Sequence, residues 1–282
     1  MHARTANPGA IAAAATRRKR PDSLLGAHGR LMMIAADHPA RAVLGAGDRP
    51  MAMADRADLL DRLCLALSRP GVNGVLGTPD VIEDLLLLGA LDDKVVVGSM
   101  NRGGLSGSVF ELDDRFTAYD AAAVHAMGYE GGKMLLRIDP ADPASVRTIE
   151  ACARAVGELA AHGRLAMIEP FLAQRADGRV HNVLSTDAMI RAVTVAAGLG
   201  STSAYTWLKV PIVPDMATVM AATTLPAVIL GGEVSSDPDA AFERWRAALA
   251  LPTVRGLVVG RSLLYPPDDD VAGAVDTAVS LF

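Results

Sequence analysis

Lysine is scarce in this chain, which makes each lysine position informative. Only four occur among the 282 residues: Lys19, Lys94, Lys133 and Lys209. Lys209 stands in the apolar run Tyr-Thr-Trp-Leu-Lys-Val-Pro-Ile-Val, which has no helical period. Burying an ammonium there costs free energy unless the group is paired or its pKa falls. A buried amine that loses its proton near neutral pH is a nucleophile that can form a Schiff base with a carbonyl.

Two other polar residues lie in neighbouring apolar runs. Lys133 opens Lys-Met-Leu-Leu-Arg-Ile-Asp, and Glu169 ends Leu-Ala-Met-Ile-Glu. In a strand, period-two alternation gives one shared face to Lys133, Leu135, Arg137 and Asp139. If these faces point inward, Lys133, Glu169 and Lys209 form one polar cluster, in which the second cation lowers the pKa of Lys209 and Glu169 transfers protons. Two alternatives stay open: Lys209 extends outward to solvent, or the three residues form a structural ion-pair cluster.

A fourth candidate follows the first apolar run, Leu-Met-Met-Ile-Ala-Ala-Asp-His. Asp37 at its end either binds a substrate hydroxyl or acts as an acid–base partner. The alternative is structural, with Asp37 capping the next segment or pairing with Arg41.

Two glycine-rich strand ends indicate a phosphate site. One apolar run ends in Gly231-Gly232-Glu and the last in Gly260-Arg261. Backbone N–H groups in such loops bind phosphate in many barrels, glycine allows close backbone approach, and arginine adds a forked donor. Plain turn chemistry is the alternative. We also predict that Arg137 binds the substrate or its phosphate. The glycine-rich loop 98–107 is interpreted as a mobile loop on the substrate side.

Eight short apolar runs alternate with helical stretches from residue 30 onward, and these elements must position the candidates. The runs span Arg30–Ala36, Gly74–Gly77, Lys94–Ser99, Lys133–Asp139, Arg164–Glu169, Tyr205–Val210, Pro226–Leu230 and Gly256–Gly260. Strands that alternate with helices are parallel, and continuous apolar strands are buried on both faces. The pattern predicts an α/β fold, a single (β/α)₈ TIM barrel over residues 30–282. Residues 1–29 are predicted to form a leader helix outside it.

Composition excludes several classes of function. The net charge of −5 and an aromatic content of 4% argue against a nucleic-acid surface, and the basic run Arg17–Arg20 is interpreted as a solvated helix end. No apolar stretch is long enough to span a membrane. Cys64 and Cys152 show no disulfide or CxxC pattern, which suits a reducing cytoplasm. The six histidines form no metal-ligand pair, so we predict neither a metal nor a cofactor.

The motifs on the fourth to sixth predicted strands resemble the class I tagatose-1,6-bisphosphate aldolase group. They are Lys133-Met-Leu-Leu-Arg-Ile-Asp, Ile168-Glu-Pro and Leu208-Lys-Val-Pro. The opening Ala-Ala-Asp37-His38 resembles archaeal-type class I fructose-bisphosphate aldolases, whereas the likeness to deoxyribose-phosphate aldolase is weaker because the lysine on strand seven is absent. The resemblance implies a metal-free Schiff-base mechanism in which Lys209 forms the imine. It makes Lys133 the second active-site lysine, Glu169 the proton-transfer carboxylate and Asp37 the acid on the first strand.

These observations together predict a class I aldolase, a lyase, that acts on a phosphorylated sugar or sugar acid. The loop Gly231-Gly232-Glu departs from the Ser-Ala-Gly type of the family, which leaves the substrate open. One alternative is a barrel isomerase or acyl-transfer enzyme in which Lys209 supplies only charge. Another is a non-catalytic regulator that binds a sugar phosphate. The small-molecule substrate is the expected partner, and a homo-oligomer is expected.

Overall fold

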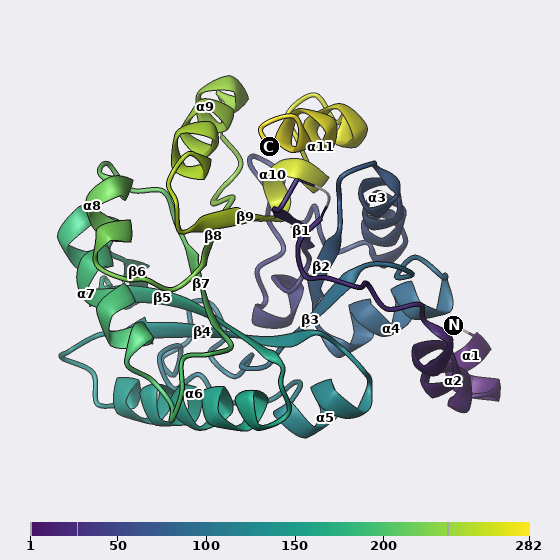
Figure 1. Cartoon of the computed structure of the whole chain (residues 1–282), viewed down its shortest axis with the longest axis horizontal. Helices are drawn as coiled ribbons and strands as arrows, with labels where there is room; N and C mark the ends of the chain where they lie inside the picture. The colour runs from purple at the N-terminus through teal and green to yellow at the C-terminus, as the bar shows by residue number, and fades with distance from the viewer. Residues whose placement is uncertain (1, 27, 236) are drawn as a thin grey trace.

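The computed structural model describes residues 2–26, 28–235 and 237–282 and has the predicted (β/α)₈ barrel, with helices packed around the closed sheet (Figure 1). Eight parallel strands pair in the circular order β1-β2-β3-β4-β5-β7-β8-β9 and back to β1. Their bounds are Leu31–Ala35 (β1), Gly74–Gly77 (β2), Val95–Ser99 (β3), Gly131–Ile138 (β4), Leu165–Ala176 (β5), Thr206–Val210 (β7), Ala227–Leu230 (β8) and Val254–Val259 (β9).

Helices follow the strands, as crossover connections between parallel strands require. They are Arg56–Ser68 (α3), Pro79–Leu87 (α4), Ala121–Ala126 (α5), Ala144–Ala161 (α6), Thr186–Ala197 (α7), Met216–Ala221 (α8), Pro238–Leu249 (α9), Arg261–Leu264 (α10) and Val271–Val279 (α11), with a short 3₁₀ turn at Pro39–Arg41. Side chains that accept hydrogen bonds from free N–H groups start many of them, such as Asp55 at α3 and Ser185 at α7. None of the helices in the described ranges is long and apolar enough to cross a membrane.

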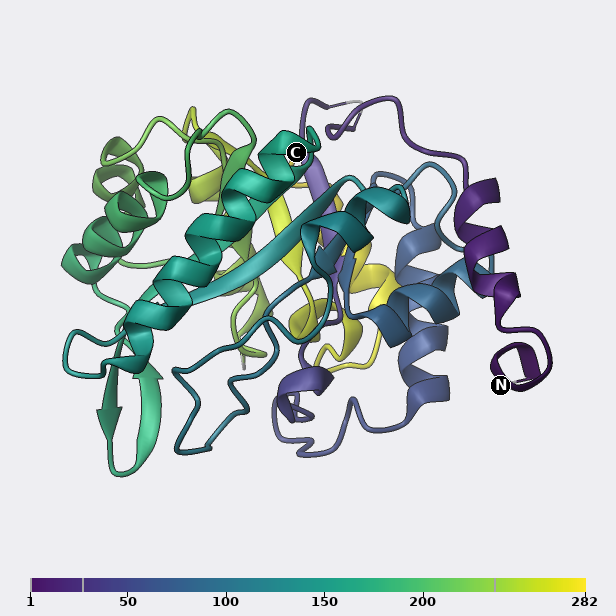
Figure 2. The same cartoon turned by 90° about the horizontal axis from the view of Figure 1, so that it is seen from below.

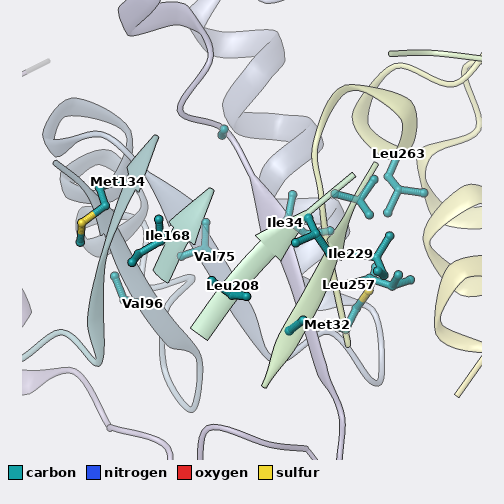
Figure 3. Close-up of a cluster of buried hydrophobic side chains, with 14 of the residues drawn as sticks. Met32, Ile34, Val75, Val96, Met134, Ile168, Leu208, Ile229, Leu257 and Leu263 are labelled. Atoms are coloured by element: carbon teal, nitrogen blue, oxygen red, sulfur yellow. The ribbon is translucent and has the colours of Figure 1, made fainter. Parts of the chain in front are cut away.

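The alternation of strand side chains divides the apolar core in two. One set faces the helices and includes Met32, Ile34, Met134, Ile168 and Leu208 (Figure 3). The other set fills the barrel interior: Leu31, Met33, Ala35, Leu76, Val95, Val97, Leu165, Met167, Val228 and Val258. A filled interior leaves room for chemistry only above this layer, at the carboxyl ends of the strands.

The segment before β1 holds two helices where one leader helix was expected, His2–Ala6 (α1) and Gly9–Arg17 (α2). The interpretation of Arg17–Arg20 as a solvated helix end is wrong for Arg18. Its guanidinium is buried, with Nη2 2.9 Å from Glu130 Oε1 and 2.8 Å from the Gly128 carbonyl oxygen that accepts its hydrogen bond. A buried guanidinium needs such partners, and here they attach the N-terminal segment to the barrel.

The sequence reading missed a β-hairpin at the end of the fifth barrel strand. β5 continues past Glu169 to Ala176 and pairs antiparallel with Arg179–Asn182 (β6). The turn is Asp177-Gly178, both with positive φ (51° and 74°), and an Asp-Gly pair between two extended runs is a strong hairpin signal. Figure 2 shows the hairpin extending beyond the barrel on the same side as the loops that follow β1 and β3.

Candidate active site

The inward face of the strands changes from apolar to charged at one height in the barrel. Met33 and Ala35 of β1 lead to Asp37, Met167 of β5 leads to Glu169, and Lys209 follows the outward Leu208 of β7. The register places β4 beside β5 and β5 beside β7, so the strands that carry Lys133, Glu169 and Lys209 are neighbours. Because side chains two residues apart share a strand face, the candidates project into the barrel.

Glu169 joins the two active-site lysines. Its Oε1 accepts a hydrogen bond from Lys209 Nζ at 2.8 Å, and its Oε2 forms an ion pair with Lys133 Nζ. The lysine side chains are only 5% and 3% exposed, so neither amine extends into bulk solvent. The sequence-predicted trio is therefore one contact cluster, and the carboxylate connects one amine to the other.

Asp37 completes the cluster from the end of β1. Its Oδ2 lies 3.3 Å from Lys133 Nζ and accepts a hydrogen bond from Ser99 Oγ at 3.0 Å. The same oxygen lies 2.9 Å from Arg102 Nη2, while Arg102 Nη1 donates to the Asp37 carbonyl oxygen at 2.9 Å. Asp37 does not pair with Arg41 and does not cap the next segment through the contacts described for it. The structural alternatives considered for Asp37 are therefore wrong.

Ser99 and Arg102 are site residues that the sequence reading missed. Ser99 ends β3 on the interior face shared with Val95 and Val97, a parity that would have identified it once the strand was placed. Arg102 lies in the following loop, where no periodicity applies. Only its burial against Asp37 reveals its role.

Charge in the cluster is nearly balanced. Lys133, Lys209 and Arg102 supply three cations against the carboxylates Asp37 and Glu169, which leaves one positive charge (3 − 2 = 1). Loss of a single proton from an amine makes the cluster neutral. In a dry interior, where net charge is costly, this balance favours one uncharged amine.

The ionisation of the individual groups assigns their chemistry. Burial lowers the pKa of Lys133 to about 8, with Asp37 and Glu169 opposing that shift. Burial alone would raise the pKa of Glu169, but the charges of Lys133 and Lys209 outweigh it and hold the pKa at about 2. In the same way Arg102 and Lys133 hold the pKa of Asp37 well below its usual range. At neutral pH both acids are carboxylates, whereas Lys133 can readily give up a proton.

This pKa predicts how Lys133 contributes to stability. Its pKa is about 8 in the folded chain and 10.5 in the unfolded chain, so the unfolded state holds more protons between these values and stability from this group rises with pH. We expect the free energy of unfolding of the wild type, relative to Lys133→Met, to increase from pH 8 to pH 10.5 and to fall back as pH is lowered to 8. Urea unfolding across that range measures it, and a flat or falling difference would contradict the assignment.

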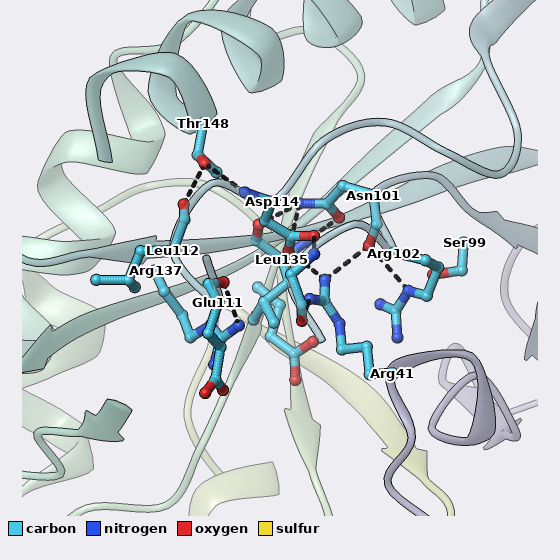
Figure 4. A network of polar contacts seen from close by, with 12 residues as sticks. Arg41, Ser99, Asn101, Arg102, Glu111, Leu112, Asp114, Leu135, Arg137 and Thr148 are labelled. Atoms are coloured by element: carbon cyan, nitrogen blue, oxygen red, sulfur yellow. Dashed lines mark hydrogen bonds and ion pairs between the residues drawn. The ribbon is translucent and has the colours of Figure 1, made fainter. Parts of the chain in front are cut away.

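The loop after β3 is fixed by a buried polar network (Figure 4). Asn101 donates to the Leu135 carbonyl oxygen at 2.6 Å and accepts from Leu135 N at 2.8 Å. Asp114 accepts a hydrogen bond from Asn101 Nδ2 at 3.0 Å and forms an ion pair with Arg41. Thr148 Oγ1 donates a hydrogen bond to the Leu112 carbonyl oxygen. The loop lies on the substrate side as predicted, but these contacts hold it and do not support the expected mobility. They also position Arg102 against Asp37.

Arg137 lies on the same face of β4 as Lys133 and forms its contacts with another residue of the chain. Its guanidinium pairs with the Glu111 carboxylate and donates to the Glu111 carbonyl oxygen at 3.0 Å. The side chain is 10% exposed and borders the cleft. Its predicted role in substrate or phosphate binding stays a prediction.

The predicted phosphate residues gather at the ends of β8 and β9. Gly232 adopts a φ of +73°, which glycine tolerates at little cost. At Gly260 a Cβ would lie 2.4 Å from the Ala35 carbonyl oxygen, so glycine is required there for packing against β1. Arg261 forms an ion pair with Glu233, in which each Nη atom of Arg261 lies 2.8 Å from one carboxylate oxygen of Glu233.

A single cleft of about 1270 Å³ connects these groups. Its lining includes the predicted residues Asp37, Lys133, Arg137, Glu169, Lys209, Gly231, Gly232, Gly260 and Arg261. Residues Val180–Asn182 of the hairpin form part of another wall. The described residues contain no group of three or more His, Cys, Asp or Glu side chains placed to hold a metal ion. The cleft brings the cationic cluster and the glycine-rich strand ends into one binding space.

The exposure of the Glu233–Arg261 ion pair leads to a prediction about phosphate binding. Glu233 is 78% exposed and Arg261 11% exposed, so the carboxylate is free to leave while the guanidinium stays in place. Because an exposed pair is worth about 0–1 kcal/mol, we expect Glu233→Gln to tighten the binding of inorganic phosphate by up to about fivefold. Isothermal titration calorimetry measures the change. Unchanged or weaker binding would show that Arg261 does not meet the anion.

Comparison with known proteins identifies the family. The sequence profile described as Cgl0159-like matches residues 29–279. The chain belongs to the Cgl0159-like family. The crystal structure of Cgl0159 from Corynebacterium glutamicum (Brevibacterium flavum) is 53% identical, covers 99% of this chain and 94% of its own, and superposes with a TM-score of 0.97. Among curated proteins nothing matches this Cgl0159-like chain.

More distant structures share the barrel. An archaeal fructose 1,6-bisphosphate aldolase is 16% identical, covering 96% of this chain and 98% of its own, with a TM-score of 0.67. A Schiff base forming fructose-1,6-bisphosphate aldolase is also 16% identical, covering 96% and 99%, with a TM-score of 0.66. At this identity the likeness establishes the fold and no more. The likeness to the tagatose-1,6-bisphosphate group stays a prediction.

Proposed function

We propose that this Cgl0159-like protein is a class I aldolase that cleaves or forms a carbon–carbon bond in a phosphorylated sugar or sugar acid through a Schiff base on Lys209. The observation that carries the proposal is the bridge from Lys209 through Glu169 to Lys133 inside the barrel. The distant barrel neighbours include a protein described as a Schiff base forming fructose-1,6-bisphosphate aldolase, which agrees with this chemistry.

Imine formation begins with an uncharged Lys209. Glu169 contacts both amines, so a proton on Lys209 can pass through its carboxylate toward Lys133. The Lys209 nitrogen adds to the substrate carbonyl carbon. The proton held on Lys133 returns through Glu169 to the leaving hydroxyl, so that loss of water leaves a positively charged iminium. Glu169 then lies beside that positive charge and stabilises it electrostatically.

Bond cleavage requires a base and, afterwards, an acid. Asp37, held as a carboxylate, removes the proton from the substrate hydroxyl that becomes the aldehyde oxygen. The carbon–carbon bond breaks, its electron pair moves into the iminium, and an enamine remains on Lys209 while the aldehyde leaves. Asp37 passes that proton to the neighbouring Lys133 amine. The resulting ammonium, with a pKa of about 8, is the matched acid for protonating the enamine carbon. Water then hydrolyses the iminium and returns the free lysine.

Arg261 and the glycines at the ends of β8 and β9 bind the substrate phosphate in this proposal. Arg261 exchanges its Glu233 partner for the phosphate, and the nearby backbone N–H groups of the loop contribute further donors. The reacting carbonyl is thereby held over Lys209, a positioning effect that converts binding energy into rate.

Borohydride trapping tests the function directly. The protein is incubated with a panel of ketose phosphates and keto-sugar-acid phosphates, reduced with borohydride, digested and mapped by mass spectrometry. We expect the mass of the reduced adduct on the peptide that contains Lys209. Labelling only at another lysine, or at none with the whole panel, would overturn the proposal.

A further inference from the structure

His38 is a half-buried polar group that the proposed mechanism does not use. It follows Asp37 at the end of β1 and lines the cleft. Its ring packs on the backbone of Gly260, where an added Cβ would lie 2.8 Å from His38 Cε1. It is also within electrostatic reach of Lys209, Glu169 and Arg261. The ring therefore lines the same cleft as the imine-forming amine and the predicted phosphate residues.

The two ring nitrogens have different surroundings. Nδ1 is buried and has no hydrogen-bond partner among the described residues. Nε2 likewise forms no hydrogen bond within the described chain, but it is not one of the buried atoms that lack a partner. A buried N–H without an acceptor is rarer in proteins than an unpaired acceptor. The tautomer with hydrogen on Nε2 therefore satisfies the site better, and it leaves an N–H donor free to bind a molecule in the cleft that His38 lines.

Four charged groups act on the ring, and they come from four segments of the chain. Asp37, which follows β1, and Glu169 from β5 favour a cationic imidazole, while Lys209 from β7 and Arg261 from α10 oppose it. Burial has the largest effect and lowers the pKa to about 3. At neutral pH the ring is uncharged, so it contributes a directed hydrogen bond and no Coulombic attraction.

We propose that His38 binds the substrate as a neutral donor, through Nε2–H, to the oxygen that links the carbon beside the Schiff-base carbon to phosphate. The proposal rests on the proposed function, because it places the Schiff-base carbon at Lys209 and the phosphate at Arg261. It makes His38 a specificity residue for ketones that carry a phosphorylated hydroxyl next to the carbonyl. Ketones that lack this oxygen lose the contact.

Substitutions at His38 test the donor. His38→Gln keeps an N–H donor at the distance of Nε2, His38→Asn places one near Nδ1 only, and His38→Leu has none. With dihydroxyacetone phosphate as the probe, we expect the half-saturating concentration for borohydride trapping at Lys209 to rise about tenfold or more in His38→Leu and His38→Asn. His38→Gln should recover most of the loss. His162→Gln, at the carboxyl end of α6 and so at the opposite face of the barrel, is the matched control.

Nuclear magnetic resonance of protein labelled with ¹⁵N-histidine provides a readout besides activity. We expect the His38 signals of a ring protonated on Nε2 and uncharged at pH 6, with the Nε2 resonance shifting when dihydroxyacetone phosphate binds. A Nδ1–H tautomer, a cationic ring at pH 6 or an unmoved resonance in the saturated protein would overturn the proposal. Equal half-saturation for wild type and His38→Leu, with that variant folded, would overturn it as well.

The two proposals fail in different ways. If the wild type forms no adduct at Lys209 with any ketose phosphate or keto-sugar-acid phosphate of the panel, the proposed function fails. If the wild-type adduct forms while the His38 variants trap with unchanged half-saturation, only the assignment of His38 fails.

Discussion

Replacing Lys209 by methionine is expected to abolish the borohydride-trapped adduct and to lower kcat for carbon–carbon cleavage by about 10⁴-fold or more. Methionine keeps a similar length and apolar stem in a side chain that is 5% exposed, but it has no amine to attack the carbonyl. The fold should persist, because the change removes a charge from a cluster that carries one net positive charge. Steady-state kinetics and mass spectrometry check the two effects.

The matched control is Lys19→Met, since Lys19 lies on the surface with its side chain 73% exposed. This variant should keep full activity and full labelling. Turnover retained in Lys209→Met would instead show that Lys209 supplies only charge, the behaviour of the isomerase or acyl-transfer alternative.

Replacing Glu169 by glutamine has the second large expected effect, and it acts on stability as well as on rate. Glu169 accepts a hydrogen bond from Lys209 at 2.8 Å and forms an ion pair with Lys133, and all three side chains are buried. Glutamine preserves the shape but leaves two buried ammonium groups without their shared anion. Removing one partner of a buried ion pair costs about 3–5 kcal/mol of unfolding free energy. Loss of the proton path should lower kcat by about 10²–10⁴-fold.

A double variant separates charge from shape. In Glu169→Gln with Lys133→Met, one of the unpaired cations is gone, so part of the lost stability should return while activity stays low. Urea unfolding of the wild type, both single variants and the double variant measures the interaction. Additive losses would mean that Glu169 and Lys133 do not stabilise each other, contrary to their contact.

Much of the fold was predictable because barrel strands leave a direct pattern. The eight apolar runs became the eight barrel strands, and the two-residue period placed Lys133 and Arg137 on one face of their strand. The hairpin formed by β5 and β6 was missed although Asp177-Gly178 signals its turn, because the prediction ended the fifth strand at Glu169. Its position outside the barrel also removes the regular spacing on which the other strands were found.

Residues in loops were harder to assign. Arg102 approaches Asp37 from the loop after β3, and nothing in its local sequence distinguishes it from a surface arginine. Arg18 was predicted to be solvated and is buried. In both cases the partner lies more than 60 residues away in the chain, so the deciding interaction is invisible until the fold brings the two together.

The amino-acid sequence by itself determined that buried strands alternate with helices and that a lysine lies within an apolar strand. These are local properties, set by side-chain volume and by the two-residue period of a strand. Only the tertiary structure decided which carboxylate that lysine meets, that Arg261 is held by Glu233, and that His38 lines the cleft with its Nδ1 buried. Contacts, burial and the resulting proton affinities depend on distances between segments far apart in the chain, and closure of the barrel sets those distances.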